Sequence, residues 1–203
     1  MDNDFGINFS NIPIVNLRIE FNNAYAFVFG EQAERALRPP IQAVEAPMLT
    51  WFGMPEDLFT LMLQRAILGI EAYLPAALKD VSAKLGHVSS ERWAQIDDPF
   101  GLGGRSAVNN IYHRMPSLVR PELSLKHTAP ALYERTLLFY KHVRNPLFHG
   151  EQLSDAKIDG IRNAFDHVAR LYEWIDGWHD PEWIMKGFGF VAGVRSRIAK
   201  PID

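Results

Sequence analysis

The stretch of sequence with the clearest chemical potential is an arginine followed, after four intervening residues, by a histidine. Arg144 and His149 stand on either side of Pro146, a residue that interrupts regular helix. The guanidinium of arginine is a permanent cation suited to phosphate oxygens, and the imidazole of histidine exchanges protons near neutral pH. Cleavage of an RNA phosphodiester needs a proton-transfer group together with positive charge beside the phosphorane. The pair therefore predicts phosphodiester chemistry.

The same spacing has a purely structural interpretation. Cations near the end of a helix interact favourably with its last carbonyl groups, by about 0.3–1 kcal/mol. On that interpretation Arg144 and His149 are helix caps in a structural bundle, and neither takes part in a reaction.

The positive charge of the chain is concentrated in one segment. The net charge is −3, yet residues 105–150 contain seven Lys or Arg and only two Asp or Glu, whereas residues 1–104 contain seven and 13. A polyanion would bind to this segment, unless it is simply a solvated basic face that balances the acidic helices. The candidate RNA contacts are Lys141, His142, Lys126 and Arg120, with His127 beside them.

Other reactive sites are not indicated. The chain has no cysteine, which excludes disulfides, thiolate metal ligands and a cysteine nucleophile. The glycines at 101, 103 and 104 lack the spacing of a phosphate-binding loop, and the seven histidines do not form a metalloprotease motif. We expect neither a metal nor a cofactor.

Length and composition indicate one globular domain. The chain has 203 residues, of which 47% are hydrophobic, and no run of about 18 apolar residues is free of charge. The first residues are acidic where a secretory signal would be basic. We therefore expect a cytoplasmic protein that does not associate with a membrane.

The pattern along the chain is mainly helical. Loose alternation of apolar residues in 1–21 suggests an arm or a short strand pair, and residues 22–37 suggest a helix interrupted by Gly30. A long helix is expected from Pro55 to Gly86.

The second half of the chain continues this pattern. A short helix is expected near 105–113, and a further helix should begin at Pro130 and end before Pro146, because the residue preceding a proline disfavours helix. Ser154 should cap the last helix, which has a single apolar stripe, and residues 181–203 form an aromatic tail.

The stretch from Val143 to Gly150, set between two amphipathic helices, resembles the signature of HEPN domains (higher eukaryotes and prokaryotes nucleotide-binding). Arg144, Asn145 and His149 fill its pattern. The resemblance covers about residues 22–180 and implies an all-α bundle of four or five helices, often a homodimer that joins two motifs in one cleft. Many members are metal-independent endoribonucleases, including toxins and antiviral effectors, that leave a cyclic phosphate.

The resemblance also implies roles for the motif residues. His149 would be the acid and base, Arg144 would stabilise the transition state, and Asn145 would orient the phosphate or the histidine. Some subfamilies add an acidic residue from a preceding helix, for which Glu134 is the nearest residue, although it is not assigned. Other members are inactive modules that bind RNA, a nucleotide or a protein. An antitoxin or a nucleotidyltransferase is the kind of partner that the resemblance suggests.

Overall fold

The computed structural model describes residues 14–37, 55–85, 106–151, 153 and 157–178, and these residues contain helices and no strand. The all-α class expected from the sequence is confirmed for this part of the chain. The helices are α1 (Ile14–Phe29), α2 (Glu31–Leu37), α3 (Pro55–Leu85), α5 (Ala107–Asn109), α6 (Met115–Val119), α7 (Leu125–Thr128), α8 (Pro130–Phe139), α9 (Asn145–Phe148) and α10 (Ile158–Asp176). Two π-helical turns, η2 (Asn110–Arg114) and η4 (Tyr140–Arg144), and one 3₁₀ turn, η3 (Pro121–Leu123), lie between them.

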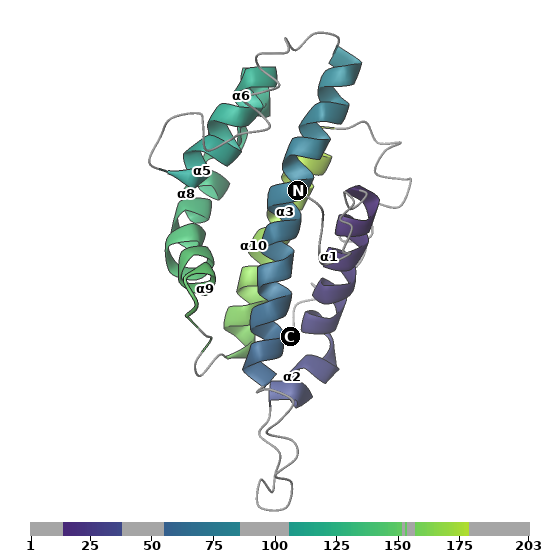
Figure 1. The fold of residues 1–203 in the computed structure, drawn as a ribbon, viewed down its shortest axis with the longest axis vertical. Coiled ribbons are helices and arrows are strands. Elements are labelled where there is room, and N and C mark those ends of the chain that lie inside the picture. The colour runs from purple at the N-terminus through teal and green to yellow at the C-terminus, as the bar shows by residue number, and fades with distance from the viewer. Residues whose placement is uncertain (1–13, 38–54, 86–105, 152, 154–156, 179–203) are drawn as a thin grey trace, which may run out of the picture.

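The helices form three layers (Figure 1). Helices α3 and α10 lie together in the middle, α1 and α2 cover one side, and the segment from α5 to α9 forms a column on the other side. Aromatic side chains from the layers meet in the core, where the ring of Tyr172 on α10 contacts Phe21 of α1 and Tyr73 of α3. The basic segment of the sequence is therefore a layer of its own, built against the α3–α10 pair.

The expected arm or strand pair is wrong for residues 14–21, which form the first half of α1. Leu17, Phe21, Tyr25 and Val28 recur at intervals of three and four residues and are all buried in the core. Helical spacing of large apolar residues therefore overrides the apparent alternation. Residues 1–13 lie outside the described residues.

A buried charged pair joins the first helix to the last. The guanidinium of Arg18 on α1 pairs with the carboxylate of Asp176 at the end of α10, and the hydroxyl of Tyr73 on α3 donates to the same carboxylate at 3.1 Å. The guanidinium also lies over the ring of Tyr172, 4.4 Å from its centroid. Because removal of one partner would leave a buried unpaired charge, this cluster fixes how α1, α3 and α10 pack.

The helix expected to stop before Pro146 does not stop there. Asn145 is helical, with φ −66° and ψ −48°, and its N–H donates to the carbonyl of Tyr140, five residues back. In a regular α-helix the proline ring would collide with the carbonyl four residues earlier. The π turn η4 shifts the hydrogen-bond register just before the proline, which lets the chain remain helical into α9.

A second π turn precedes a proline in the same way in the described part of the chain. Met115 precedes Pro116, and the N–H of Met115 donates to the carbonyl of Asn110 at the end of the π turn η2. As a result, the short helix expected near 105–113 continues through η2 and α6 to Val119. Pro116 and Pro146 are thus each accommodated by a π turn rather than by a break.

The remaining helix predictions agree with the structure at most of their ends. Helix α1 ends before Gly30, α3 runs from Pro55 to Leu85, and α8 begins at Pro130. Helix α10 begins at Ile158, with Lys157 at its N-cap. Ser154, the expected cap, and the expected tail at 181–203 lie outside the described residues.

Within α3, the stretch Leu58–Ala83 has the length and mean hydropathy, 1.2, of a membrane-spanning helix. Half of that stretch is buried inside the protein, where α3 packs against both α1 and α10. It has the environment of the central helix of a bundle.

Candidate functional site around Arg144 and His149

The guanidinium of Arg144 is held by a carboxylate from the central layer. Its Nε lies 3.2 Å from one oxygen of Glu71 on α3, and its Nη2 lies 3.4 Å from the other oxygen. The guanidinium also stacks near the rings of Phe148 and Tyr140, at 4.6 and 5.6 Å from their centroids. A paired, ring-packed guanidinium has a fixed direction, which an arginine free in solvent lacks.

Two tyrosine hydroxyls extend this contact into the core. The hydroxyl of Tyr140 donates to Glu71 at 2.6 Å, and the hydroxyl of Tyr112 lies 3.2 Å from that of Tyr140. Because the single proton of Tyr140 is used toward Glu71, Tyr112 must donate to Tyr140. Burial raises the pKa of both tyrosines well above the ordinary value, with Glu71 adding to the effect, so both stay protonated. They position Glu71 and do not act as bases.

The two π turns build this chain of hydrogen bonds. Tyr112 belongs to η2 and Tyr140 to η4, and their rings meet edge to face with centroids 5.8 Å apart. π turns inside helices are often found at functional sites, because they redirect side chains from the regular helical positions. Here they bring together residues that are far apart in the sequence. Tyr140 bonds Glu71, 69 residues earlier, and lies beside the hydroxyl of Tyr112, 28 residues earlier.

His149 stands at the end of α9 and is exposed. Its backbone N–H still donates to the carbonyl of Asn145, and the next residue, Gly150, has a positive φ of 88° that ends the helix. The N–H of Glu151 then returns to the carbonyl of Pro146 at 3.0 Å, which is the closing bond of a Schellman motif. The imidazole is therefore placed at a helix end, outside the core.

A side chain of α3 also fixes this end of the motif. The amide of Gln64 donates to the carbonyl of Leu147 at 3.1 Å. Gln64 and Glu71 are seven residues apart, two turns along one face of α3, so a single helix face holds both ends of α9.

The motif residues lie at the two ends of one short helix. Arg144 is the N-cap of α9 and His149 its C-cap, a separation of about 7–8 Å along the helix axis. The side chain of Asn145 is exposed beside them. Arg144 uses two of its N–H edges toward Glu71, which leaves donors for a phosphate, and its side chain is 22% exposed.

The expected RNA contacts are exposed on the same layer of the fold. Lys141 and His142 lie on η4 directly before Arg144, whereas Arg120 and Lys126 lie on the segment before α8. The ammonium of Lys126 lies 6.0 Å from the ring centroid of Tyr133. The structure thus brings Lys141 and His142 next to the motif and places Lys126 on α7, over the ring of Tyr133 in the first half of α8.

Glu71 is the residue that sequence reasoning missed. The nearest acidic candidate, Glu134, is exposed on α8, and the partner of Arg144 comes instead from a helix 73 residues earlier. One signal was present in the sequence: Glu71 directly follows Ile70 and precedes Tyr73 and Leu74 in the apolar run of α3. A carboxylate within such a run needs a partner when the helix is buried.

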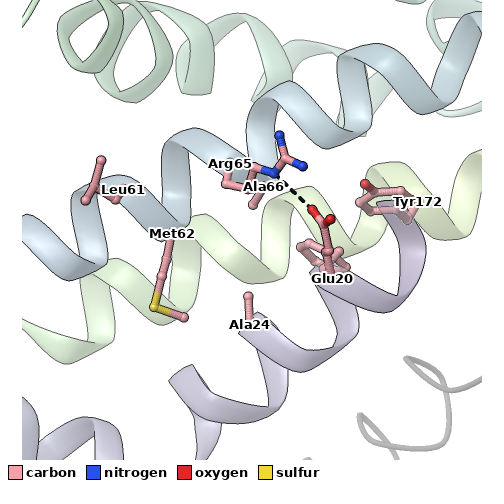
Figure 2. A pocket seen from close by; sticks show the side chains of 8 residues that line it. Glu20, Ala24, Leu61, Met62, Arg65, Ala66 and Tyr172 are labelled. Carbon is pink, nitrogen blue, oxygen red and sulfur yellow. Dashed lines mark hydrogen bonds and ion pairs between the residues drawn. The ribbon is translucent and has the colours of Figure 1, made fainter. Parts of the chain in front are cut away.

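A cavity of about 250 Å³ lies between α1, α3 and α10 (Figure 2), and Arg144 and Glu71 are not among its lining residues. Its lining is mostly apolar, and the ion pair between Glu20 of α1 and Arg65 of α3, with an N–O distance of 2.9 Å, borders it. It contributes no side chain to the Arg144 site.

The described residues contain no group of three or more His, Asp or Glu side chains that could hold a metal ion. Comparison of the chain with protein-family models, with curated proteins and with solved structures gives no significant match.

Proposed function

We propose that the protein is a HEPN-like, metal-independent endoribonuclease in which Arg144 and His149 carry the reaction. The observation that carries this proposal is the arrangement around α9. An oriented guanidinium, supported by Glu71, stands at one end of a single helical turn, and an exposed imidazole stands at the other end.

The chemistry follows from these two groups. His149 removes the proton of a 2′-hydroxyl, or delivers one to the leaving 5′-oxygen, and the ring is accessible because it lies outside the core. The remaining N–H donors of Arg144 stabilise the charge that develops on the phosphorane oxygens. Asn145, exposed between them in sequence, orients the phosphate or the imidazole. Attack by the 2′-oxygen yields a cyclic phosphate.

The proposal includes a homodimer in the cytoplasm. One imidazole per chain is expected to serve as base or as acid, and a second copy of the motif in the same cleft would supply the complementary group. Regulation by an antitoxin or by a nucleotidyltransferase fits a ribonuclease of this class, which has to be kept inactive in the cell that makes it.

A second candidate function is a silent module that binds RNA, a nucleotide or a protein. The observation in its favour is also the Arg144–Glu71 contact, because the carboxylate offsets the charge of the guanidinium in the described state. In such a module Arg144 would contribute affinity, and His149 would contribute little.

The test is cleavage of a mixed RNA pool by the wild type, His149→Ala and Arg144→Ala, with EDTA present and the product ends mapped. The matched control is Arg65→Ala, because Arg65 on α3 also pairs with a glutamate but lies on the opposite flank. We expect cyclic phosphate ends with the wild type and with Arg65→Ala. We expect a loss of at least about 100-fold with His149→Ala, since general acid–base catalysis contributes about 10²–10⁴-fold.

Two other results would contradict the proposal. Cleavage that persists in His149→Ala would remove His149 from the reaction. Salt-sensitive binding that depends on Arg144, with no cleavage by any variant, would favour the silent module instead.

A further inference from the structure

A second cluster of nitrogen-bearing side chains lies where α7 packs against η2. The rings of His113, in η2, and His127, in α7, meet edge to face with centroids 5.1 Å apart. Lys126 adjoins His127 in the sequence, and both are exposed, whereas His113 is half-buried. These three side chains form the His113 cluster.

Hydrogen bonds fix the protons of the two rings. The hydroxyl of Ser124 is buried and lies 2.7 Å from Nδ1 of His113, its partner among the described residues. A buried hydroxyl needs an acceptor, so Ser124 donates to Nδ1 and the ring proton of neutral His113 is on Nε2. In His127, Nδ1 donates to the carbonyl of Pro121 at 3.2 Å, because a carbonyl can only accept.

The electrostatic environment of the cluster is positive. Burial lowers the pKa of His113, and the charges of Lys126, His127 and Arg114 lower it further. The three side-chain charges that act on the ring of His113 are therefore all positive. A site with an N–H donor, a lysine and a second imidazole suits an anion.

The position of the cluster relative to Arg144 follows from helix geometry. Lys126 lies over the ring of Tyr133 and Arg144 lies near the ring of Tyr140. Tyr133 and Tyr140 are seven residues apart on the continuous helix of α8 and η4, a rise of about 10 Å. The rings that the two cations approach therefore lie two turns apart along one helix.

We propose that His113, Lys126 and His127 form a second phosphate subsite, which binds the RNA backbone close to the phosphate held at Arg144. The identity of the ligand as RNA rests on the proposed function, whereas the phosphate site itself rests on the geometry of the cluster. The subsite positions the RNA along α8, and Arg144 and His149 at the ends of α9 carry out the reaction.

The subsite is tested first with inorganic phosphate, observed through the imidazole resonances of the full chain at constant ionic strength. Bound phosphate should raise the pKa of His113, because an anion counters the positive neighbours that lower it. The His167 ring provides the internal control, since it is buried on α10 and should not respond to phosphate. Lys126→Ala should reduce the response of His113, and Lys157→Ala, an exposed lysine at the start of α10, should not.

The second arm uses a single-stranded RNA with methylated 2′-hydroxyls, which cannot be cleaved through a cyclic phosphate. Loss of one phosphate contact in Lys126→Ala should weaken binding and reduce the slope of log affinity against log salt by about 0.7, whereas Lys157→Ala should keep the slope of the wild type.

The outcomes separate the two proposals. Cleavage of RNA by a protein whose His113 ignores phosphate, and whose Lys126→Ala variant keeps its salt slope, would overturn the subsite and leave the ribonuclease standing. A phosphate response without any RNA binding or cleavage would overturn RNA as the ligand and keep the phosphate site. Absence of all these effects would overturn both.

Discussion

Arg144 shows how one charged side chain can be fixed by groups from three separate segments. Glu71 on α3 pairs with it, Phe148 on α9 lies against it, and Tyr140 on η4 both stacks near it and donates to its carboxylate partner. Neither member of the pair is fully buried: 22% of the Arg144 side chain and 16% of the Glu71 side chain are exposed. This leaves room for a phosphate at the guanidinium while the carboxylate remains in place.

Replacement of Glu71 by glutamine tests this arrangement. Glu71→Gln keeps an oxygen for Tyr140 but removes the negative charge that orients Arg144. We expect a loss of about 1–3 kcal/mol in the free energy of unfolding, since hydrogen bonds to charged groups contribute that much. RNA cleavage should fall more than the fraction of unfolded protein explains. Urea unfolding and single-turnover cleavage measure the two effects.

The matched control is Glu20→Gln. Glu20 pairs with Arg65 at 2.9 Å, but these side chains are 45% and 52% exposed, so the pair should contribute less than about 1 kcal/mol. Equal losses in the two variants would show that Glu71 does no more than a surface ion pair.

For single residues, the sequence predicts the two reactive side chains but not the carboxylate that holds one of them. The spacing of Arg144 and His149 is local and can be found along the chain, whereas Glu71 meets Arg144 only after α3 and α9 have packed. A pairing over 73 residues depends on which face of each helix is buried, and one sequence does not determine this for η4, because a π turn changes the face.

Among the elements, helices with a regular apolar stripe were predicted well. Helix α10 has Ile161, Phe165, Val168 and Tyr172 buried at intervals of three and four residues, and the structure confirms it. The ends of elements near prolines were predicted less well. Pro146 was expected to stop a helix, and the η4 turn accommodates it instead. The chain stays helical beyond the proline, where Gln64 of α3 donates to the carbonyl of Leu147.

The end of α9 gives a test at the same scale. Gly150 has a φ of 88° and no atom near the position of an added Cβ, so Gly150→Ala should suffer only the backbone cost of the left-handed conformation, about 1–2 kcal/mol. The control is Gly160→Ala, an equally open position in the helical backbone of α10, which should gain about 0.5–1 kcal/mol. Thermal unfolding of both variants measures these changes in stability, which should have opposite signs.

If Gly150→Ala is as stable as the wild type, the positive φ is not needed to end α9. In that case the exposed position of His149 would not depend on the Schellman motif, and the cleavage rate of the variant should also be unchanged.

The whole molecule combines an apolar three-layer bundle with buried polar groups of very different kinds. Arg18 and Asp176 are paired across α1 and α10, whereas both nitrogens of His167, on α10, lack a hydrogen-bond partner among the described residues. The ring of His167 lies against Phe139 of α8, with centroids 4.6 Å apart, and the residue is 1% exposed. His167 thus lies at the contact between the central layer and the basic layer.

This histidine makes the stability of the bundle depend on pH. Burial, with help from Arg135 and Arg170, lowers the pKa of His167 from 6.5 to about 4. Between these values the unfolded chain binds a proton that the folded protein does not bind, so stability falls as the pH falls. The contribution is complete above pH 6.5 and is lost toward pH 4, a change of about 3 kcal/mol.

Asp176 acts in the opposite direction, because burial raises its pKa from 3.8 to about 6 and protonation therefore favours the folded state over that range.

The pH profile of the wild type alone sums the contributions of His167 and Asp176, so the informative quantity is a difference between two proteins. Urea unfolding of the wild type and of His167→Phe, at pH 7.5 and pH 4.5, removes the contribution of Asp176, which both proteins share. Any constant packing cost of the larger ring also cancels. The stability advantage of the wild type over His167→Phe should shrink by about 2–3 kcal/mol on acidification. Parallel profiles would mean that His167 is protonated inside the folded protein, and the contact between α8 and α10 would then have to accommodate a charge.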